Sequence, residues 1–315
     1  MLIVTGGAGF IGSQLVQELN RRGHTDILVV DNLERSEKFR NLSDLVIQDY
    51  MDKRTFRARL DAGTFDLQAE AIFHNGACSD TMGGDGRYML ENNFGDSKAV
   101  LNYALSRGIP LVYASSAATY GAGPRFAPDP ANERPLNVYG YSKLLFDQHV
   151  RHILPQARST VVGLRYFNVY GPREDHKGRM MSVLHQLLRQ LRDEGVCRLF
   201  AGSGGYGPGE QLRDFVHVGD VVDMGLHFAS GPMATGIFNA GTGRARSFNA
   251  IAQTLIKLLG RGRIEYIPFP AELEGKYQSY TEADLTGLRA AGYSRPATEL
   301  EEGIRLTLEE LDGRG

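Results

Sequence analysis

Short runs of β-branched and other apolar residues recur along the first half of the chain and predict buried strands. These runs cover residues 1–4, 26–31, 45–48, 71–74, 111–115 and 159–165. Amphipathic stretches separate most of them, which is typical of a parallel sheet with crossover helices. We therefore expect an α/β fold: a doubly wound, Rossmann-like parallel sheet with a second, smaller α/β substrate domain.

The regular alternation weakens after Arg165, where Gly and Pro become frequent at residues 171–178 and 202–209. We expect a second region to begin near Asn168. The predicted dinucleotide-binding domain comprises residues 1–167 plus 214–240. The predicted substrate domain comprises residues 168–213 plus 241–315.

The first apolar run leads directly into a glycine-rich turn. Gly7, Gly9 and Gly12 have the spacing of a dinucleotide-binding loop, and Ile11 and Leu15 begin the apolar side of a following helix. Glycines let the backbone approach a pyrophosphate, which then lies at the positive end of that helix. The strand, loop and helix together predict nucleotide binding.

Asp31 ends the second apolar run about 20 residues beyond the loop, where an acid meets the adenosine ribose. A carboxylate there favours NAD, because it repels a 2′-phosphate. Asn32, Lys38 and Lys53 would instead hold the 2′-phosphate of NADP. The simpler interpretation of the two lysines is that they are ordinary solvated surface charges. The residues alone leave the two cofactors open.

Tyr139 and Lys143 lie one helical turn apart if residues 139–154 form a helix, which the apolar stripe at Phe146 and Val150 favours. A free tyrosine has a pKa near ~10, and an adjacent ammonium favours the phenolate and lowers that pKa. Such a tyrosine moves the proton of an alcohol while a cofactor takes the hydride.

Composition excludes several classes of protein. The 315 residues carry a formal net charge of −2 with both signs mixed, so we expect neither a nucleic acid nor a membrane partner. The first predicted strand begins at Met1, leaving no room for a signal peptide. Cys78 and Cys197 are far apart and form no metal-ligand pattern. We expect a cytoplasmic protein with free thiols and no metal.

Several motifs resemble the extended short-chain dehydrogenase/reductase superfamily. They are the glycine loop and residues 115–121, 139–143, 213–221 and 237–243. Within that superfamily the resemblance is closest to the ADP-L-glycero-D-manno-heptose 6-epimerase family. The segments that carry this closer resemblance are residues 74–79, 136–143, 168–178, 264–270, 283–286 and 288–293.

The resemblance implies a tightly held NADP and epimerisation at C6 of ADP-D-glycero-D-manno-heptose through a transient ketone, for lipopolysaccharide core synthesis. It also implies a ring-like homo-oligomer, possibly a pentamer. Hydride delivery to two faces requires two acid/base groups, which map to Tyr139 and Lys177, with Ser116 holding the reacting oxygen. Lys143 would contact the nicotinamide ribose.

The implied binding residues form two sets. For the cofactor they are Gly6, Gly9, Phe10, Ile11, Gly12, Asp31, Asn32, Lys38, Lys53, Asn75, Gly76, Ala77, Cys78, Ser79, Asn92, Lys143 and Val169. For the nucleotide sugar they are Asn168, Arg179, Gln186, Phe200, Ala201, Gly202, Ser203, Arg213 and Tyr277.

Some of these residues have simpler interpretations. Lys177 is alternatively a charge that faces solvent or a phosphate, Ser116 a residue that merely ends a strand, and Arg213 the partner of Asp214 or another acid. The chain also departs from the family's pattern: Arg179 and Gln186 replace a serine and a histidine, and Asn75 replaces an acid. The loop at residues 202–210 is longer, and we expect it to form a lip over the nucleotide.

Three competing functions remain. A sugar 4,6-dehydratase needs an acidic pair beside its serine or threonine, and Ala117 and Ala118 follow Ser116 instead. A UDP-sugar 4-epimerase needs only one base, so an essential Lys177 would count against it. An NADP-binding sensor without chemistry would be expected to lose Tyr139 or Lys143, and both are present.

Overall fold

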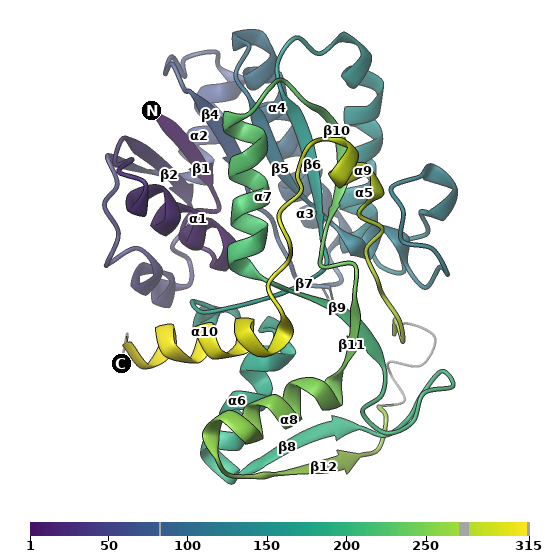
Figure 1. The fold of residues 1–315 in the computed structure, drawn as a ribbon. Helices are drawn as coiled ribbons and strands as arrows, with labels where there is room; N and C mark the ends of the chain where they lie inside the picture. Colours follow the sequence, from purple (N-terminus) through teal and green to yellow (C-terminus); the bar gives the residue numbers. More distant parts are fainter. Residues whose placement is uncertain (82, 271–276, 314–315) are drawn as a thin grey trace.

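The structure is a computed structural model that describes residues 1–81, 83–270 and 277–313. Among these residues, seven parallel strands form one sheet in the order β10-β6-β5-β4-β1-β2-β3 (Figure 1). The strands are β1 (Leu2–Thr5), β2 (Ile27–Asp31), β3 (Asp49–Asp52), β4 (Ala71–His74), β5 (Leu111–Ser116), β6 (Val161–Tyr166) and β10 (Thr235–Ala240). The predicted doubly wound, Rossmann-like fold is confirmed.

The prediction of a strand at residues 45–48 is wrong. The third strand of the chain is β3, whose Asp49–Asp52 pairs with Leu28–Asp31 at the edge of the sheet. Leu45 and Ile47 are apolar for a different reason, because they pack against the hydrophobic core from the segment that precedes β3. An edge strand has one unpaired side, so its sequence is more polar than that of a central strand.

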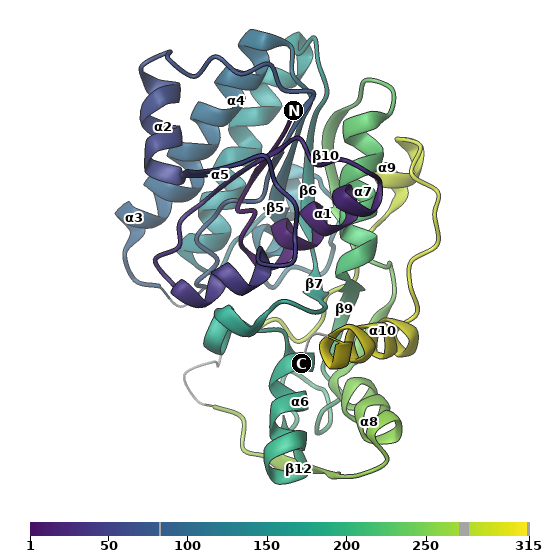
Figure 2. The same cartoon turned by 90° about the vertical axis from the view of Figure 1, so that its left-hand side faces the viewer.

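Helices cover both faces of the sheet (Figure 2). Helices α1 and α7 pack together on one face, and α2, α4 and α5 cover the other. The helices of this part of the chain are α1 (Phe10–Arg21), α2 (Lys53–Asp61), α3 (Gly86–Leu90), α4 (Asp96–Arg107), α5 (Val138–Ile153), α7 (Val218–Ser230) and α9 (Thr286–Ala290). Short 3-10 or π turns are η1 (Ser36–Asn41), η2 (Glu91–Gly95), η3 (Ala117–Tyr120), η4 (Pro130–Asn132), η5 (Leu154–Gln156) and η6 (Asp175–Met180). The helix predicted around Tyr139 is α5.

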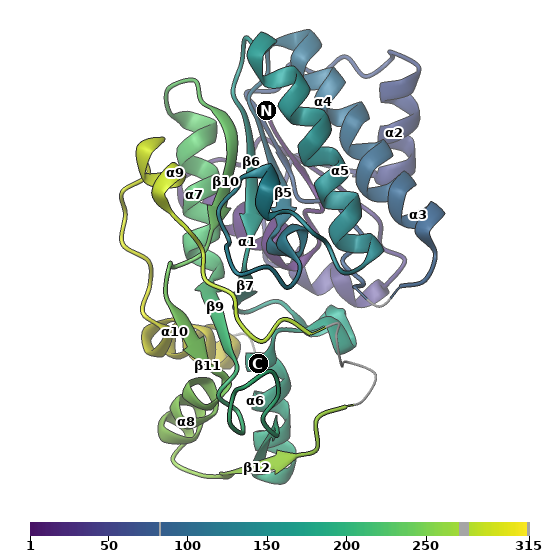
Figure 3. The same ribbon diagram turned by 90° about the vertical axis from the view of Figure 1, so that its right-hand side faces the viewer.

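Two smaller sheets lie beyond the large one (Figures 1 and 3). The first joins β11 (Ala245–Ser247), β9 (Leu212–His217) and β7 (Asn168–Tyr170), and the second joins β12 (Arg263–Ile267) and β8 (Val196–Phe200). Helices α6 (Val183–Glu194), α8 (Phe248–Leu259) and α10 (Leu300–Gly313) share a separate core with them. The predicted boundaries between two domains stay a prediction.

The strand order places the site. From β1 the sheet continues through β2 to β3 on one side, and through β4, β5 and β6 to β10 on the other. The order therefore reverses between β1 and β4, and ligands of such sheets bind at this point, beyond the carboxyl ends of the strands. The glycine loop after β1, residues 75–79 after β4, and Ser116 at the end of β5 all lie at that edge.

Candidate active site

The glycine loop has no room for side chains. A Cβ on Gly12 would lie 2.1 Å from the Gly6 carbonyl oxygen, and one on Gly6, where φ is +68°, would lie 2.7 Å from the backbone of Asn75. Helix α1 starts directly after Gly9, which has no side chain to cap it, and its first turn contains no acid. The helix amides therefore favour an anion. The loop, including the predicted residues Phe10 and Ile11, fits the pyrophosphate of a dinucleotide.

Asp31 and Lys38 form an ion pair at the end of β2. Asp31 is buried and also accepts hydrogen bonds from the Ala8 amide at 2.8 Å and the Asn32 amide at 2.7 Å. The Lys38 Nζ donates in addition to the Asn32 carbonyl at 2.9 Å. The structure thus brings together three of the predicted cofactor residues. Lys38 therefore offsets the charge of Asp31 at the end of β2.

Lys53 directly follows Asp52 of β3, which pairs with Asp31 of β2, and its Nζ donates to Asn92 Oδ1 at 2.5 Å. Asn92 belongs to the π-helical turn η2, which interrupts the helical segment between α3 and α4. Such π turns occur frequently at functional sites. The interaction joins Lys53, the second lysine predicted to bind the cofactor, to η2, the element that faces residues 75–79.

The sequence did not identify Asn93, which clamps two walls of the site. Its Oδ1 accepts from the Cys78 amide at 2.7 Å, and its Nδ2 donates to the Cys78 carbonyl at 2.9 Å and to Ser142 Oγ at 3.0 Å. Gly76 is held separately, by a bond from its amide to Thr5 Oγ1 at 3.1 Å. These bonds fix the loop containing Asn75, Ala77 and Ser79 against α5. A single Asn-Asn pair in the sequence gives no sign of this clamp.

Helix α5 presents Tyr139 beside Ser116. Asn137 caps the helix by accepting from the Gly140 amide at 2.8 Å, and a Cβ on Gly140 would lie 2.6 Å from the Ala118 carbonyl oxygen. This close approach of α5 to η3 places the phenol next to Ser116. Ser116 Oγ also accepts from the Ala118 amide at 3.1 Å and so caps η3, and its role in holding the reacting oxygen stays a prediction.

The expectation of a lowered phenol pKa is wrong. Loss of hydration raises the pKa of Tyr139 above its usual value, and the hydrogen bond from Ser116 only partly opposes that effect. Lys143 is itself buried, which lowers its pKa to about 8, while the nearby Asp147 carboxylate acts in the opposite direction. Its Nζ donates to the Ala114 carbonyl at 2.8 Å. The ammonium is thus held by β5 and by the charge of Asp147.

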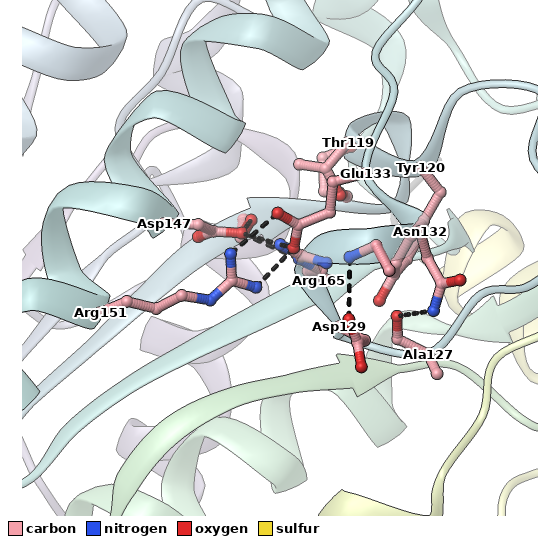
Figure 4. A network of polar contacts seen from close by, with 12 residues as sticks. Thr119, Tyr120, Ala127, Asp129, Asn132, Glu133, Asp147, Arg151 and Arg165 are labelled. Atoms are coloured by element: carbon pink, nitrogen blue, oxygen red, sulfur yellow. Dashed lines mark hydrogen bonds and ion pairs between the residues drawn. The ribbon is translucent and has the colours of Figure 1, made fainter.

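A buried network anchors this side of the site (Figure 4). Asp147, one turn after Lys143, accepts from Tyr113 Oη at 2.9 Å, Ser115 Oγ at 2.8 Å and Arg165 Nε at 2.9 Å. Arg165 is fully buried and also pairs with Glu133 at 2.5 Å. The network joins α5, β5 and β6, and it anchors β5 next to Ser116 and α5 one turn after Lys143.

Lys177 approaches the site from η6, beyond β7. Its Nζ lies 2.7 Å from Glu174 Oε2 and 4.9 Å from the centre of the Phe10 ring at the start of α1. The ammonium is therefore bound to a carboxylate next to the glycine loop and is not purely solvated, whereas its role as an acid/base and the alternative that it faces a phosphate both stay predictions. Asn168 and Val169 lie in β7, the strand that leads toward this loop.

Arg179 and Gln186 lie on exposed positions near this loop. The Arg179 guanidinium pairs with Asp80 at 3.1 Å, which connects η6 to the segment that follows residues 75–79. Gln186 Nε2 donates to the Met181 carbonyl at 2.9 Å. Arg179 therefore links η6 to the segment after β4, whereas the side-chain hydrogen bonds of Gln186 among the described residues go to the neighbouring η6 and the residue after it.

Arg213 is buried, and no acidic side chain among the described residues forms an ion pair with it. It donates to the Leu212 carbonyl at 3.0 Å, and its guanidinium lies 4.7 Å from the Tyr277 ring centre and 5.7 Å from that of Phe248. Burial lowers its pKa. Asp214 does not pair with it, because Asp214 accepts from the Thr242, Gly243 and Ala283 amides. A buried cation between aromatic rings is suited to bind an anion.

An aromatic group adjoins Arg213. The ring centre of Phe269 lies 5.6 Å from that of Phe200 and 5.3 Å from that of Tyr277. No role was predicted for Phe269 from the sequence. Its only signal was its position within residues 264–270, one of the segments that carry the family resemblance. Gln211 Nε2 donates to the Ala201 carbonyl and to Ser203 Oγ, both at 3.1 Å, and so fixes the strand end before Gly202.

The long loop at residues 202–210 is tied down at its far end. Asn249 Nδ2 donates to the Pro208 carbonyl at 3.0 Å, and the Gly209 amide donates to the Phe200 carbonyl at 3.0 Å. The role of this loop as a lip over the nucleotide stays a prediction. Across the described residues, no three or more His, Cys, Asp or Glu side chains are grouped so as to hold a metal ion. In the same part of the chain no helix has both the length and the apolar character for crossing a membrane.

Comparison with known proteins identifies the family and supports the fold of this chain. Residues 2–241 match the NAD dependent epimerase/dehydratase family. A protein of Alkalilimnicola ehrlichii named ADP-L-glycero-D-manno-heptose-6-epimerase is 57% identical over 311 residues, which cover 99% of this chain and 97% of the relative.

Solved structures extend the comparison. The ADP-L-glycero-D-manno-heptose-6-epimerase of Helicobacter pylori has a TM-score of 0.86 and 31% identity, covering 99% of this chain and 96% of its own. The UDP-glucose 4-epimerase of Thermus thermophilus, in complex with NAD, has a TM-score of 0.79 and 27% identity and covers 99% of each chain.

Proposed function

The chain belongs to the NAD dependent epimerase/dehydratase family and, within it, to the ADP-L-glycero-D-manno-heptose-6-epimerases, and on this premise we propose that it inverts C6 of ADP-D-glycero-D-manno-heptose. The observation that supports the proposal is that two candidate acid/base side chains come from separate elements near the edge of the sheet that carries the glycine loop. Tyr139 lies beside Ser116, and Lys177 comes from a separate loop beside Phe10. Ala117 and Ala118 after Ser116 supply no acid for the elimination of water.

The proposed reaction is a redox cycle with no net oxidation. A nicotinamide cofactor bound at the glycine loop would supply the hydride chemistry, accepting a hydride from C6 and returning it to the opposite face of the ketone. One of Tyr139 and Lys177 removes the hydroxyl proton of the substrate, and the other protonates the oxygen of the product. Ser116 holds that oxygen by a hydrogen bond in both states, and the buried Lys143 positions the cofactor ribose next to Tyr139.

We propose NADP as the cofactor. Lys38 already neutralises Asp31, and Lys53 follows Asp52, the residue of β3 that pairs with Asp31. Two lysines and the Asn32 side chain are suited to a 2′-phosphate. NAD in the Thermus thermophilus complex supports the alternative. The identity and mass of the nucleotide released from the purified protein decide between them.

The other end of the site suits the nucleoside diphosphate. Arg213 is the proposed ligand of the diphosphate, because its planar fork binds two phosphate oxygens. Phe200, Phe269 and Tyr277 offer apolar faces for the adenine. Asn168, Arg179, Gln186 and residues 201–203 are the proposed contacts of the remaining nucleotide sugar.

We further propose a cytoplasmic homo-oligomer, possibly a pentamer, whose product supplies lipopolysaccharide core synthesis. These proposals rest on the family resemblance. Sedimentation of the purified protein tests the assembly.

The activity is tested by incubating the protein with ADP-D-glycero-D-manno-heptose and separating the two C6 epimers by chromatography. Formation of the L epimer without added cofactor supports the proposal. Inert ADP-heptose together with epimerised UDP-galactose would instead identify a UDP-sugar 4-epimerase. Bound nucleotide without turnover of either sugar would identify a nucleotide-binding sensor.

A further inference from the structure

We propose that Glu174 is the positioning residue for Lys177 and holds its ammonium at the face of the substrate that Lys177 serves. This proposal deepens the proposed function and rests on it. Glu174 is fully buried, and its Oε2 accepts from Lys177 Nζ and from the Ser182 amide, each at 2.7 Å. The bond to the Ser182 amide fixes the carboxylate independently of Lys177.

The second oxygen of this carboxylate has no hydrogen-bond partner in the described part of the chain. Glu174 Oε1 is buried and accepts no hydrogen bond from any described residue. The His185 Nε2 lies 3.8 Å from it but is only 2.7 Å from the Gly171 carbonyl, so its N–H is already used. A buried carboxylate needs both hydrogen bonds and a countercharge. Lys177 is the closest cation, so separating the two is unfavourable.

The backbone before Glu174 is held in an unusual conformation. Arg173 is the one non-glycine residue with a positive φ, +72°, among the described residues. Its buried guanidinium pairs with Asp44 at 2.8 Å and donates to the Asn41 carbonyl at 2.7 Å. Such conformations persist only where surrounding contacts impose them, and they cluster at functional sites. The turn directs Glu174 inward, beneath η6.

The same turn is connected to the cofactor loop. Asn41 Nδ2 donates to the Ala8 carbonyl at 3.1 Å and to the Arg173 carbonyl at 3.2 Å. Lys177 itself lies over the ring of Phe10. Glu174 and the glycine loop are therefore parts of one hydrogen-bonded unit. A carboxylate in this unit fixes the ammonium relative to the cofactor site, although η6 is otherwise a short surface turn.

The test measures the two half-reactions separately in the protein with its bound nucleotide. Each pure C6 epimer is mixed with excess enzyme, and the near-ultraviolet absorbance of reduced nicotinamide is followed. Glu174→Gln keeps the shape and the bond from the Ser182 amide but removes the charge that holds Lys177. The matched control is Asp175→Asn, because Asp175 is exposed and pairs with Arg189 at 3.0 Å.

Glu174→Gln is expected to slow the oxidation of one epimer by about tenfold or more, while the other epimer changes by less than about twofold. This is part of the ~10²–10⁴-fold that a positioned acid or base contributes. Asp175→Asn should leave both rates unchanged. Equal slowing of both epimers, or no slowing, would overturn the proposal, because a purely structural role does not distinguish the two faces.

Two further variants keep the test decisive. If Glu174→Gln does not fold, Glu174→Asp is used instead, because it retains the charge and moves it back by one methylene. We then expect the oxidation of the same C6 epimer to be slowed, but by a smaller factor. Lys177→Met distinguishes a failure of the proposed two-base function from a failure of the role proposed for Glu174. An active Lys177→Met variant refutes the proposed two-base function, whereas an inactive one combined with a symmetric Glu174 effect refutes only the role of Glu174.

Discussion

The two sides of the site hold their buried charges in opposite ways. On the side of the large sheet, Asp147 accepts three side-chain hydrogen bonds and Arg165 pairs with two carboxylates. On the other side, Arg213 has aromatic rings and one carbonyl around it, and no acid among the described residues. Charges balanced within the protein fix its geometry, whereas an unbalanced buried charge is available for a ligand.

This contrast predicts that mutations on the two sides separate stability from substrate affinity. Removing a charge from the balanced network should destabilise the protein. Removing the unbalanced charge should weaken substrate binding with little effect on folding.

The largest effect is expected for Asp147→Asn. The substitution leaves the fully buried Arg165 with one carboxylate fewer, and breaking a buried pair typically costs about 3–5 kcal/mol of the free energy of unfolding. Chemical denaturation of the variant measures this loss. Asp66→Asn is the matched control, because Asp66 forms an exposed pair with Arg107 and should change stability by less than about 1 kcal/mol. Equal effects of the two substitutions would contradict the balanced-network account.

Lys143→Met tests a charge that is only partly balanced. The pKa of Lys143 is lowered from 10.5 to about 8, so the unfolded chain binds the proton more tightly than the folded protein. The cost of burying the ammonium is therefore fully present below pH 8 and disappears as the pH rises to about 10.5. In nucleotide-free protein at pH 7, we expect the variant to be more stable than wild type by on the order of 3 kcal/mol.

Denaturation at several pH values checks this prediction. The difference between the two proteins should shrink as the pH rises from 8 to 10.5. Lys257→Met, at an exposed position of α8, is the control and should alter stability by less than about 0.5 kcal/mol at pH 7. A difference that does not vary with pH would show that burial of this ammonium is not its cause.

Arg213→Ala is expected to affect binding rather than folding. Loss of the charged hydrogen bonds to a diphosphate, about 1.5–3 kcal/mol each, should raise KM for ADP-heptose about 10–100-fold. The free energy of unfolding should stay the same or increase, because a buried charge without an acid is removed. Arg246, its cross-strand neighbour, pairs with Glu301 and provides the control. An unchanged KM in Arg213→Ala, or a KM raised equally in Arg246→Ala, would remove Arg213 from the diphosphate site.

The sequence predicted best what depends on local spacing. The glycine loop, Asp31 and the one-turn separation of Tyr139 and Lys143 are all short-range patterns, and the structure places them as expected. Apolar character alone did not distinguish β3 from the segment before it, because Leu45 and Ile47 are buried without pairing in the sheet.

Contacts between distant residues could not be predicted. Asp147 and Arg165 meet only because α5 packs on β5 and β6. Asn93 reaches Cys78 through a π-helical turn that has no simple pattern. The raised pKa of Tyr139 likewise depends on how much water the folded site excludes, and not on the nearest charge in the sequence. Glu174 was visible in its motif, but its burial was not.

The central claim, that two different groups serve the two faces of C6, is tested most directly by comparing Tyr139→Phe with Lys177→Met. Both variants should retain the nucleotide and lose epimerisation by about 10²–10⁴-fold. Each should still form reduced nicotinamide in a single turnover, but from opposite C6 epimers. Full epimerisation by Lys177→Met would contradict the account and leave Tyr139 as the only acid/base.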